Sequence, residues 1–474
     1  MTRPRWGALP PLRSGSLPRF PGWAAALGPG IIWMALAQGS GELIWWPYLI
    51  AKYGLAFLVL LIPACLLQFP INYAIGSYTV LTGETIFQGF IRLNRWVALA
   101  VWILMAASFL WFGAFASAGG TALAALTNFP PGWTLRGQTL CWAYGSMAVC
   151  FVALVWSRVV YTVVERVMMA VAAVTFLGLL LACSHPTVAA SAPAFFRALI
   201  IPAWPPARPW QPQDATILLT AVTFAGLGGF WTLFYSYWLR EKGAGMAGRM
   251  GRVEGLSGRH HVTYETGAVD RSPPPREVAR WRRFLAVDSA IGIFGNIATT
   301  LMTCLLAYAV LHPLGLVPEH YQLAVVQSRF FELSWGLAGR LLFLVVAAAF
   351  LSDTWMATAD AVARIHTDCV LSFFPRARRF EVKRWYLGWL VALTVITAVT
   401  MWLSEPGPLI LLSAVIGFMG TVSFAVLLGW LNGRLLPRLV NRAACPQRWA
   451  ALGLWVAGLA YAALAVAYLW IRST

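Results

Sequence analysis

Long apolar runs recur along the chain, separated by short polar segments. Each run has about 20 residues or more, the length that a helix needs to cross the hydrocarbon core of a bilayer. Because that core holds no water to satisfy backbone N–H and C=O groups, such runs fold there as helices and not as open sheets. The pattern predicts an all-α, polytopic membrane protein. Its eleven predicted transmembrane helices lie at about 22–51, 55–80, 97–127, 138–157, 165–184, 214–239, 284–311, 337–363, 386–403, 407–433 and 448–471.

Two of the predicted spans are interrupted by glycines. The first contains Gly-Ser-Gly followed by a glutamate at 39–42, and the sixth contains Gly-Leu-Gly-Gly at 226–229. Glycine costs about 1 kcal/mol relative to alanine inside a helix. Irregular backbone at membrane depth is tolerated only beside protein or a water-filled cavity. We therefore expect both helices to be broken, although small residues also permit close helix packing.

The two interruptions divide the chain into similar halves, because spans one and six each open a set of five. This arrangement is typical of transporters with inverted repeats, whose substrate site lies between discontinuous helices near the membrane midplane. The expected organisation is a disordered cytoplasmic tail (1–21), a first repeat (22–184), an extracytoplasmic loop (185–213), a second repeat (214–433) that includes a basic cytoplasmic loop (240–283), and helix 11 with its flanks (434–474).

Composition and charge agree with this organisation and give it an orientation. Hydrophobic residues make up 59% of the chain and charged residues 11%, which excludes an ordinary soluble protein. The formal net charge of +18 comes from Lys and Arg gathered mostly on one side of the predicted spans, and that side is normally cytoplasmic. We expect a multi-pass protein of the inner cell membrane with a cytoplasmic N-terminus. Its basic loop should contact anionic membrane lipid, not nucleic acid.

Motifs for other chemistry are missing. The sequence has no Walker loop, no HExxH and no GxSxG, so we expect neither enzyme activity nor a cofactor. The 7 cysteines are odd in number and form no CxxC pair, which argues against a disulfide framework or a zinc site. No feature indicates an oligomeric state.

Short motifs follow one another in a fixed order along most of the chain. They are GPG at 28–30 eight residues before GSGE, KYG at 52–54, VLTGETI at 80–86, the pair Glu165-Arg166, RFLAVDSAIGIFGNIA at 283–298, FLSDTWMATADAVARIHTDCV at 350–370, and LNGRLLPRL at 431–439. In order and spacing this set resembles the Nramp divalent-metal transporters, from about residue 22 to about 450. The resemblance implies a LeuT-like 5+5 inverted repeat with discontinuous helices 1 and 6.

The site motifs depart from the family pattern. The family's metal-binding Asp corresponds to Gly39, and its Asn corresponds to Glu42, so a carboxylate is kept but shifted. The family's Met-Pro-His corresponds to residues 229–231, which are Gly-Phe-Trp. Loss of the soft thioether ligand favours a hard cation bound by oxygen, such as Mg²⁺ or Mn²⁺.

The family's proton route also has no counterpart. Its acidic pair corresponds to Ala114 and Ser117, and its histidine corresponds to Trp231. We expect transport without that route, either by uniport or with another coupling ion.

Glu42 is the centre of the predicted site. A charged side chain at the bilayer centre costs about 2.5–3.5 kcal/mol on insertion scales, so Glu42 should be protonated, paired or in a wet cavity. We expect it to bind a divalent cation together with oxygens from both interruptions. The other residues of this predicted set are Gln38, Gly39, Ser40, Gly226, Gly228 and Gly229. The alternatives are a protonated Glu42 that caps the second half-helix, or a proton or Na⁺ coupling role with a different substrate.

Further polar residues lie inside later spans. Asp288 and Asn296 are two turns apart on one face of the seventh span, and Asp353 lies in the eighth. They form a predicted secondary polar track to the site, or else bond to neighbouring helices. Asp360 is one turn from Arg364 and is expected to form an ion pair with it.

These observations predict an Nramp-related secondary transporter of a hard divalent cation that works by alternating access. One rival is a secondary transporter of a small organic solute, in which the glycines make room for a larger ligand. The other is a non-transporting membrane scaffold or sensor that keeps the fold.

Overall fold

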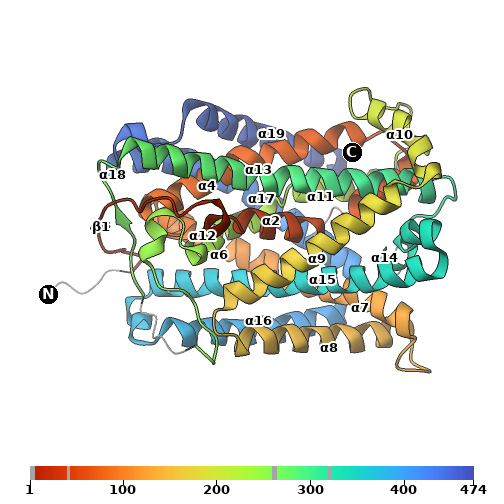
Figure 1. Cartoon of the computed structure of the whole chain (residues 1–474), viewed down its shortest axis with the longest axis horizontal. Helices are drawn as coiled ribbons and strands as arrows, with labels where there is room; N and C mark the ends of the chain where they lie inside the picture. The colour runs from red at the N-terminus through yellow and green to blue at the C-terminus, as the bar shows by residue number, and fades with distance from the viewer. Residues whose placement is uncertain (1–5, 40–42, 259–263, 319–322, 474) are drawn as a thin grey trace.

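Helices form almost the whole molecule (Figure 1). The computed structural model describes residues 6–39, 43–258, 264–318 and 323–473. Within these residues ten helical segments are long and apolar enough to cross a membrane, and they coincide with the second to the eleventh predicted spans. The chain is therefore a multi-pass membrane protein. The ten segments are Leu58–Thr82, Arg95–Thr127, Leu135–Trp156, Val160–Cys183, Pro212–Lys242, Pro275–Leu311, Arg329–Phe373, Val382–Leu403, Pro406–Leu439 and Arg448–Ile471.

After the one-turn helix α1 (Trp23–Ala26), the first predicted span contains two further short helices in the described residues. α2 (Pro29–Ala37) and α3 (Trp45–Tyr53) have nine residues each, too few for either to cross a bilayer alone. α2 begins with a proline, whose fixed φ and missing N–H suit the first helical turn. Residues 40–42, which include the predicted site residues Ser40 and Glu42, lie outside the described residues.

The sixth predicted span is divided in the same way. α11 (Ala215–Phe224) is followed by a 3-10 helix at Gly229–Leu233 and then by α12 (Phe234–Lys242). Between the helices the backbone is left-handed at Gly226 (φ 71°) and Leu227 (φ 64°). Glycine adopts this conformation freely, whereas leucine does so at an energetic cost. The GLGG stretch breaks the helix, as the sequence predicts.

The other helices surround these two interrupted elements. They are α1 (Trp23–Ala26), α4 (Leu61–Thr82), α5 (Ile86–Leu93), α6 (Arg95–Ser108), α7 (Gly113–Thr127), α8 (Leu135–Trp156), α9 (Val160–Cys183), α10 (Pro186–Ala198), α13 (Pro275–Leu306), α14 (Leu323–Gln327), α15 (Arg329–Phe373), α16 (Val382–Leu403), α17 (Pro406–Trp430), α18 (Leu436–Leu439) and α19 (Arg448–Ser473). α2 packs chiefly against α13 and α9, while α15 packs against α7, α8, α9 and α16. In Figure 1, α8, α13, α15 and α16 run in roughly one direction, and α9 crosses them obliquely.

Figure 1 also distinguishes the two ends of the molecule. Strand β1 (Arg13–Ser14) and α18 lie at one end, which we call the β1 end; α10 and α14 lie at the other, the α10 end. The segment 185–213, predicted as an extracytoplasmic loop, contains helix α10.

The N-terminal segment differs from the disordered tail expected at 1–21. Among its described residues, β1 pairs in parallel with β2 (Ala268–Val269) of the basic loop. The backbone N–H of Leu17 donates to the carboxylate of Asp270 at 2.9 Å, and the Leu17 side chain is buried. A basic, proline-rich composition lacks the periodicity of a helix or a long strand. The segment is ordered instead by backbone bonds to a distant loop, which local sequence does not reveal.

Candidate functional site

The first interruption opens onto a small cavity. Gln38, at the end of α2, is 4% exposed. It lines the cavity with four threonines and a few apolar side chains, and the cavity has about 210 Å³ of empty space. The threonines are Thr175 of α9 and Thr299, Thr300 and Thr303 of α13. Within the described residues neither polar atom of the Gln38 side chain has a hydrogen-bond partner. Buried amides are normally bonded, so a ligand, a water or the neighbouring residues 40–42 would complete its bonds here.

The threonine hydroxyls present acceptors to this cavity. Thr299 and Thr300 each donate to the backbone carbonyl of Asn296 at 2.9 Å, and Thr303 donates to that of Thr300 at 3.0 Å. Because a hydroxyl has one hydrogen and two lone pairs, donation along the helix leaves the oxygen lone pairs unused. Such oxygens suit a ligand with positive charge or with N–H or O–H donors.

Gly39 is fitted against α15. A Cβ atom at this position would lie 2.0 Å from the Oγ1 of Thr354 and 3.4 Å from the carbonyl oxygen of Phe350. A larger residue fits only if the Thr354 side chain or α15 moves. Glycine, which has no Cβ, is accommodated in this close contact.

The glycines of the second interruption face other helices. Gly226 and Gly228 lie against Gln68 of α4, and Gly229 lies against Gly417 of α17. In the described part of the chain, none of these three glycines lines the Gln38 cavity. The predicted set of ligands from both interruptions is thus not gathered in one cavity there.

Trp33 nevertheless joins the two interruptions. This fully buried residue of α2 donates its indole N–H to the carbonyl of Gly226 at 2.8 Å. Its ring packs edge-on against that of Tyr235 in α12. The sequence motifs did not single out Trp33, because an indole in an apolar run looks like any other lipid-facing or core side chain.

Asp288 lies at the other end of α2, away from the Gln38 cavity. Its carboxylate accepts a hydrogen bond from the hydroxyl of Tyr235 at 2.8 Å. It is so close to the N-terminal turn of α2 that a Cβ on Gly30 would lie 2.9 Å from its Cγ. A carboxylate is favourable at a helix N-terminus. Beside it, Lys242 of α12 forms an ion pair with Glu165 of α9 at 2.7 Å.

The polar residues of α13 follow the length of α2. Asp288 and Gly292 contact its first turns, and the threonines of the cavity lie near its end. Between them, the amide of Asn296 is 3.9 Å from the sulfur of Cys65. The predicted track at 288 and 296 therefore runs beside α2. Asp353 lies elsewhere, on the side of α15 that faces α8 and α9.

A second ion pair holds the α10 end of the interrupted span. Lys52, near the end of α3, lies 2.7 Å from the carboxylate of Asp214, just before α11. Tyr53 donates to the same carboxylate at 2.6 Å, and Lys52 also donates to Gln211 at 2.7 Å. Sequence reasoning missed this cluster. The available signal was a lysine at the end of one predicted span and an aspartate at the start of another.

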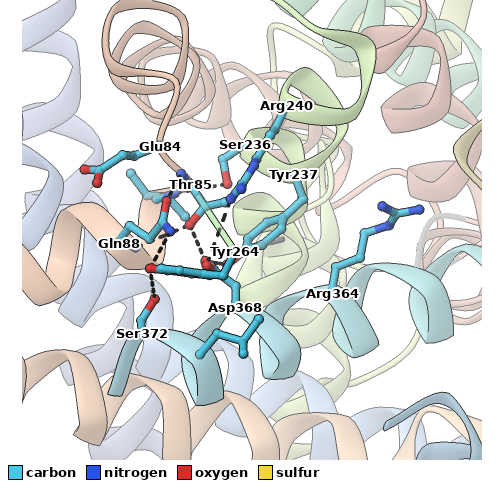
Figure 2. Close-up of polar contacts among 12 residues, drawn as sticks. Glu84, Thr85, Gln88, Ser236, Tyr237, Arg240, Tyr264, Arg364, Asp368 and Ser372 are labelled. Atoms are coloured by element: carbon cyan, nitrogen blue, oxygen red, sulfur yellow. Dashed lines mark hydrogen bonds and ion pairs between the residues drawn. The ribbon is translucent and has the colours of Figure 1, made fainter. Parts of the chain in front are cut away.

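A third polar network lies near the C-terminal end of α15 (Figure 2). Asp368 accepts hydrogen bonds from Thr85 and from Tyr237, the latter at 3.0 Å, and the guanidinium of Arg240 is 4.0 Å away. From the basic loop, the hydroxyl of Tyr264 bonds to Gln88 and Ser372 at 3.0 Å each. Burial raises the pKa of Tyr264 to about 12, so it remains a neutral donor at physiological pH.

Arg364 forms the buried part of this region. Its guanidinium lies 2.9 Å from Asp360, which confirms the predicted ion pair, and 2.6 Å from Glu241 of α12. Tyr386 of α16 donates to Asp360 at 2.7 Å. Arg364 and Arg240 both line a cavity with about 580 Å³ of empty space. The network ties α12, α15, α16 and the basic loop together.

Metal ligands are sparse in the described part of the chain. There, no three His, Cys, Asp or Glu side chains are grouped so that they could hold a metal ion. The described oxygens near the first interruption are amide, hydroxyl and carbonyl oxygens. The predicted carboxylate of this site, Glu42, lies outside the described residues.

Solved structures with a similar fold are membrane transporters. A mutant of the manganese transporter of Eremococcus coleocola matches with a TM-score of 0.63 and 14% identity, over 96% of this chain and 88% of that one. MhsT in complex with L-phenylalanine matches with a TM-score of 0.54 and 15% identity, over 95% and 99%. Mhp1, a nucleobase-cation-symport-1 family transporter, matches with a TM-score of 0.52 and 14% identity, over 94% and 92%.

At these identities the likeness shows the fold, which is a LeuT-like transporter fold. No protein-family model and no curated protein sequence matches the chain.

Proposed function

We propose that this protein is a secondary transporter that moves a hard divalent cation, of the Mg²⁺ or Mn²⁺ type, by alternating access. In this proposal α2 and α3 together form an eleventh crossing. Residues 22–184 and 214–433 form the two inverted repeats, each opened by a discontinuous helix. The likeness in fold to a manganese transporter supports the proposal.

The observation that carries the choice of cargo is the chemistry of the Gln38 cavity. Its described polar lining consists of an amide and four threonine hydroxyls, and three of those hydroxyls have their hydrogens engaged along α13. Neutral oxygen ligands suit Mg²⁺ and Mn²⁺, whereas thioether and thiolate ligands suit softer metals. Glu42, three residues from Gly39, would supply the formal negative charge.

The dimensions of the cavity also favour an ion over an organic solute. The part of the cavity that a water-sized sphere can occupy is about 10 Å³, about what a single water needs, which is too small for an organic solute. Beside the second interruption the space is filled by Trp231, which is fully buried. Its ring packs edge-on against those of Phe109, Phe115 and Phe224 at centroid distances of 4.9, 5.9 and 5.0 Å.

Alternating access would use the two ion pairs at the ends of the interrupted first span. Glu165, Lys242 and Asp288 lie against the start of α2 at Gly28 and Gly30. The pair Lys52–Asp214 joins the end of α3 to the segment before α11. With both sets formed, the cavity would be closed to both sides. Because the span is broken, either piece could swing outward while the other stays in place.

The test is cation uptake and binding by wild type and Glu42→Gln in proteoliposomes. We expect the wild type to take up Mn²⁺ or Mg²⁺ with little preference for Cd²⁺. Loss of the carboxylate should weaken binding by about tenfold or more. Glu332→Gln, at the start of α15 and outside the cavity lining, is the matched control and should behave as wild type. Uptake of neither cation by a correctly folded wild type would refute the proposal.

A further inference from the structure

The last helix, α19, lies outside the two proposed repeats, and one face of it is exposed and apolar. Leu459, Val466 and Leu469 on that face are 66–70% exposed. The other face packs against α4, α11 and α17. There Tyr461 is fully buried, and its ring packs edge-on against that of Phe418 in α17, with the centroids 6.0 Å apart. A buried tyrosine hydroxyl normally has a hydrogen-bond partner, and that partner shows which part of the molecule α19 reaches.

The partner of Tyr461 is Gln68, a fully buried residue of α4. The side-chain amide nitrogen of Gln68 donates to the Tyr461 hydroxyl. At the other end of the amide, the oxygen accepts from the hydroxyl of Thr232 at 3.4 Å. The Thr232 hydroxyl also donates to the carbonyl of Leu227 at 2.9 Å. Because the terminal torsion of a glutamine is broad, these partners determine which way the amide of Gln68 faces.

Gln68 lies directly against the backbone of the second interruption. A Cβ on Gly226 would lie 3.1 Å from the Cγ of Gln68, and a Cβ on Gly228 would lie 2.7 Å from its Nε2. Between these glycines the chain turns through the left-handed conformations of Gly226 and Leu227. The position of the Gln68 amide therefore limits the shapes that this turn can take.

The same turn is bonded to the first interrupted span. The carbonyl of Gly226 accepts the indole N–H of Trp33 in α2 at 2.8 Å, and α2 leads to Gln38 and its cavity. A hydrogen bond needs the acceptor oxygen at the right distance and angle. The bond to Trp33 thus depends on the shape of a turn against which Gln68 is packed.

We propose that Tyr461 is a positioning residue for the second interruption. Its hydroxyl fixes the amide of Gln68, the amide keeps the GLGG backbone in its observed shape, and that shape presents the carbonyl of Gly226 to Trp33. In this way α19 acts on α2 and on the cavity at its end, although in the described part of the chain no residue of α19 lines that cavity. The effect on the backbone is independent of the proposed function, and the effect on transport rests on it.

The first test is hydrogen–deuterium exchange of the full-length protein in lipid nanodiscs, read from peptides that cover 224–234. Tyr461→Phe keeps the ring and removes only the hydroxyl. We expect exchange at the second interruption to become about tenfold faster, because the buried amide of Gln68 loses a partner and the turn opens more often. Unchanged exchange there, or an increase spread evenly over all helices, would overturn the proposal.

Tyr468→Phe is the matched control. Tyr468 also belongs to α19, and its hydroxyl lies 3.1 Å from that of Thr216, near the start of α11 and away from the turn. Removing this hydroxyl should leave exchange at the second interruption as in the wild type. Equal acceleration in the two tyrosine variants would overturn the proposal, because any loss of contact between α19 and the sixth span would then have the same effect.

A double-variant cycle tests whether Tyr461 acts through Gln68. Gln68→Leu should accelerate exchange at the second interruption, and Tyr461→Phe should add nothing in that background, since the hydroxyl no longer has an amide to fix. Additive effects of the two changes would overturn the proposal. If Gln68→Leu does not fold, the comparison of Tyr461→Phe with Tyr468→Phe still decides.

The consequence for transport is measured as Mn²⁺ uptake into proteoliposomes. We expect Tyr461→Phe to lower the maximal rate about fivefold and to leave KM within about twofold, because the conformational step is altered and the cavity lining is not. Tyr468→Phe should keep both values. Wild-type rates in Tyr461→Phe would overturn the role in transport. If the wild type takes up neither Mn²⁺ nor Mg²⁺, the proposed function fails, while the exchange experiment still tests the positioning of the turn.

Discussion

Gly39 shows at the scale of one residue how closely the first interruption is fitted to its surroundings. The clash that a Cβ would make there involves a single side-chain oxygen, that of Thr354, at 2.0 Å; the next atom, the Cβ of Thr354, is 3.2 Å away. The clash is therefore avoided either by glycine at position 39 or by loss of the Thr354 hydroxyl. A larger side chain at this position would meet the same oxygen.

We expect Gly39→Ala to destabilise the protein by about 1–3 kcal/mol, the usual cost of overpacking. Thr354→Ala in the same chain should restore much of this loss, because it removes the clashing oxygen. Thermal unfolding of the two single variants and the double variant in detergent measures the coupling. Additive effects would mean that this contact with Thr354 does not limit the size of the residue at position 39.

Arg364 gives a second prediction at the residue scale. It faces both Asp360 and Glu241, and all three are buried. Arg364→Met would leave two buried carboxylates without their cation, which costs about 3–5 kcal/mol for a broken buried pair. The control is Arg280→Met, since the side chain of Arg280 is 60% exposed and its pair with Glu277 is a surface pair of little energetic value. Equal unfolding midpoints for the two variants would contradict this account.

At the scale of elements, the interrupted first span is held at its two ends by different partners. Glu165 of α9 and Lys242 of α12, paired with each other, lie against Gly28 at the start of α2. Asp214, before α11, pairs with Lys52 at the end of α3. The two contacts share no residue. Loosening one should therefore leave the other intact and expose the cavity to one side only.

We expect Lys242→Met to open the Gln38 cavity toward the β1 end and Asp214→Asn to open it toward the α10 end. The reporter is Thr300→Cys in the cavity, labelled by a membrane-impermeant cationic thiol reagent from each side of the vesicle. Losing about 1 kcal/mol of pairing should raise the labelling rate about fivefold on one side. The protein without the reporter cysteine gives the background labelling. Labelling that rises equally from both sides in either variant would refute the assignment of each ion pair to one side of the membrane.

Sequence predicts best those helices whose length and form the lipid bilayer determines. Ten spans follow from apolar length alone, and the breaks follow from GSG and GLGG, because a bilayer enforces helices and glycine interrupts them. The contacts between elements are less accessible to such reasoning. Two contacts join residues more than 150 positions apart: the bond from Trp33 to Gly226 and the pair Lys52–Asp214. The sequence around either partner does not predict the other.

At the scale of the whole molecule, the N-terminal segment and the basic loop fasten the β1 end. β1 pairs with β2, and Leu17 is buried with its N–H bonded to Asp270. The guanidinium of Arg249 in the loop also donates to the carbonyl of Ser16 at 2.8 Å. The two segments thus hold each other, although more than 200 residues separate them.

We expect Leu17→Asp to release this fastening, because it would bury a charge in place of an apolar side chain. Trypsin should then cut the arginine-rich loop about tenfold faster, as local opening becomes more frequent. Ala8→Asp, at an exposed position of the same segment, is the control and should leave the cleavage rate unchanged. An unchanged rate in Leu17→Asp would mean that the loop is held by its own contacts alone.

The hydrogen bond between Trp33 and Gly226 couples the two helix breaks of the molecule. It fastens one broken helix to the other by a single donor and a single acceptor, so neither break can widen without straining its counterpart. In the proposed transport cycle this bond, worth about 1 kcal/mol, would favour states in which the two breaks move together over states in which one opens alone.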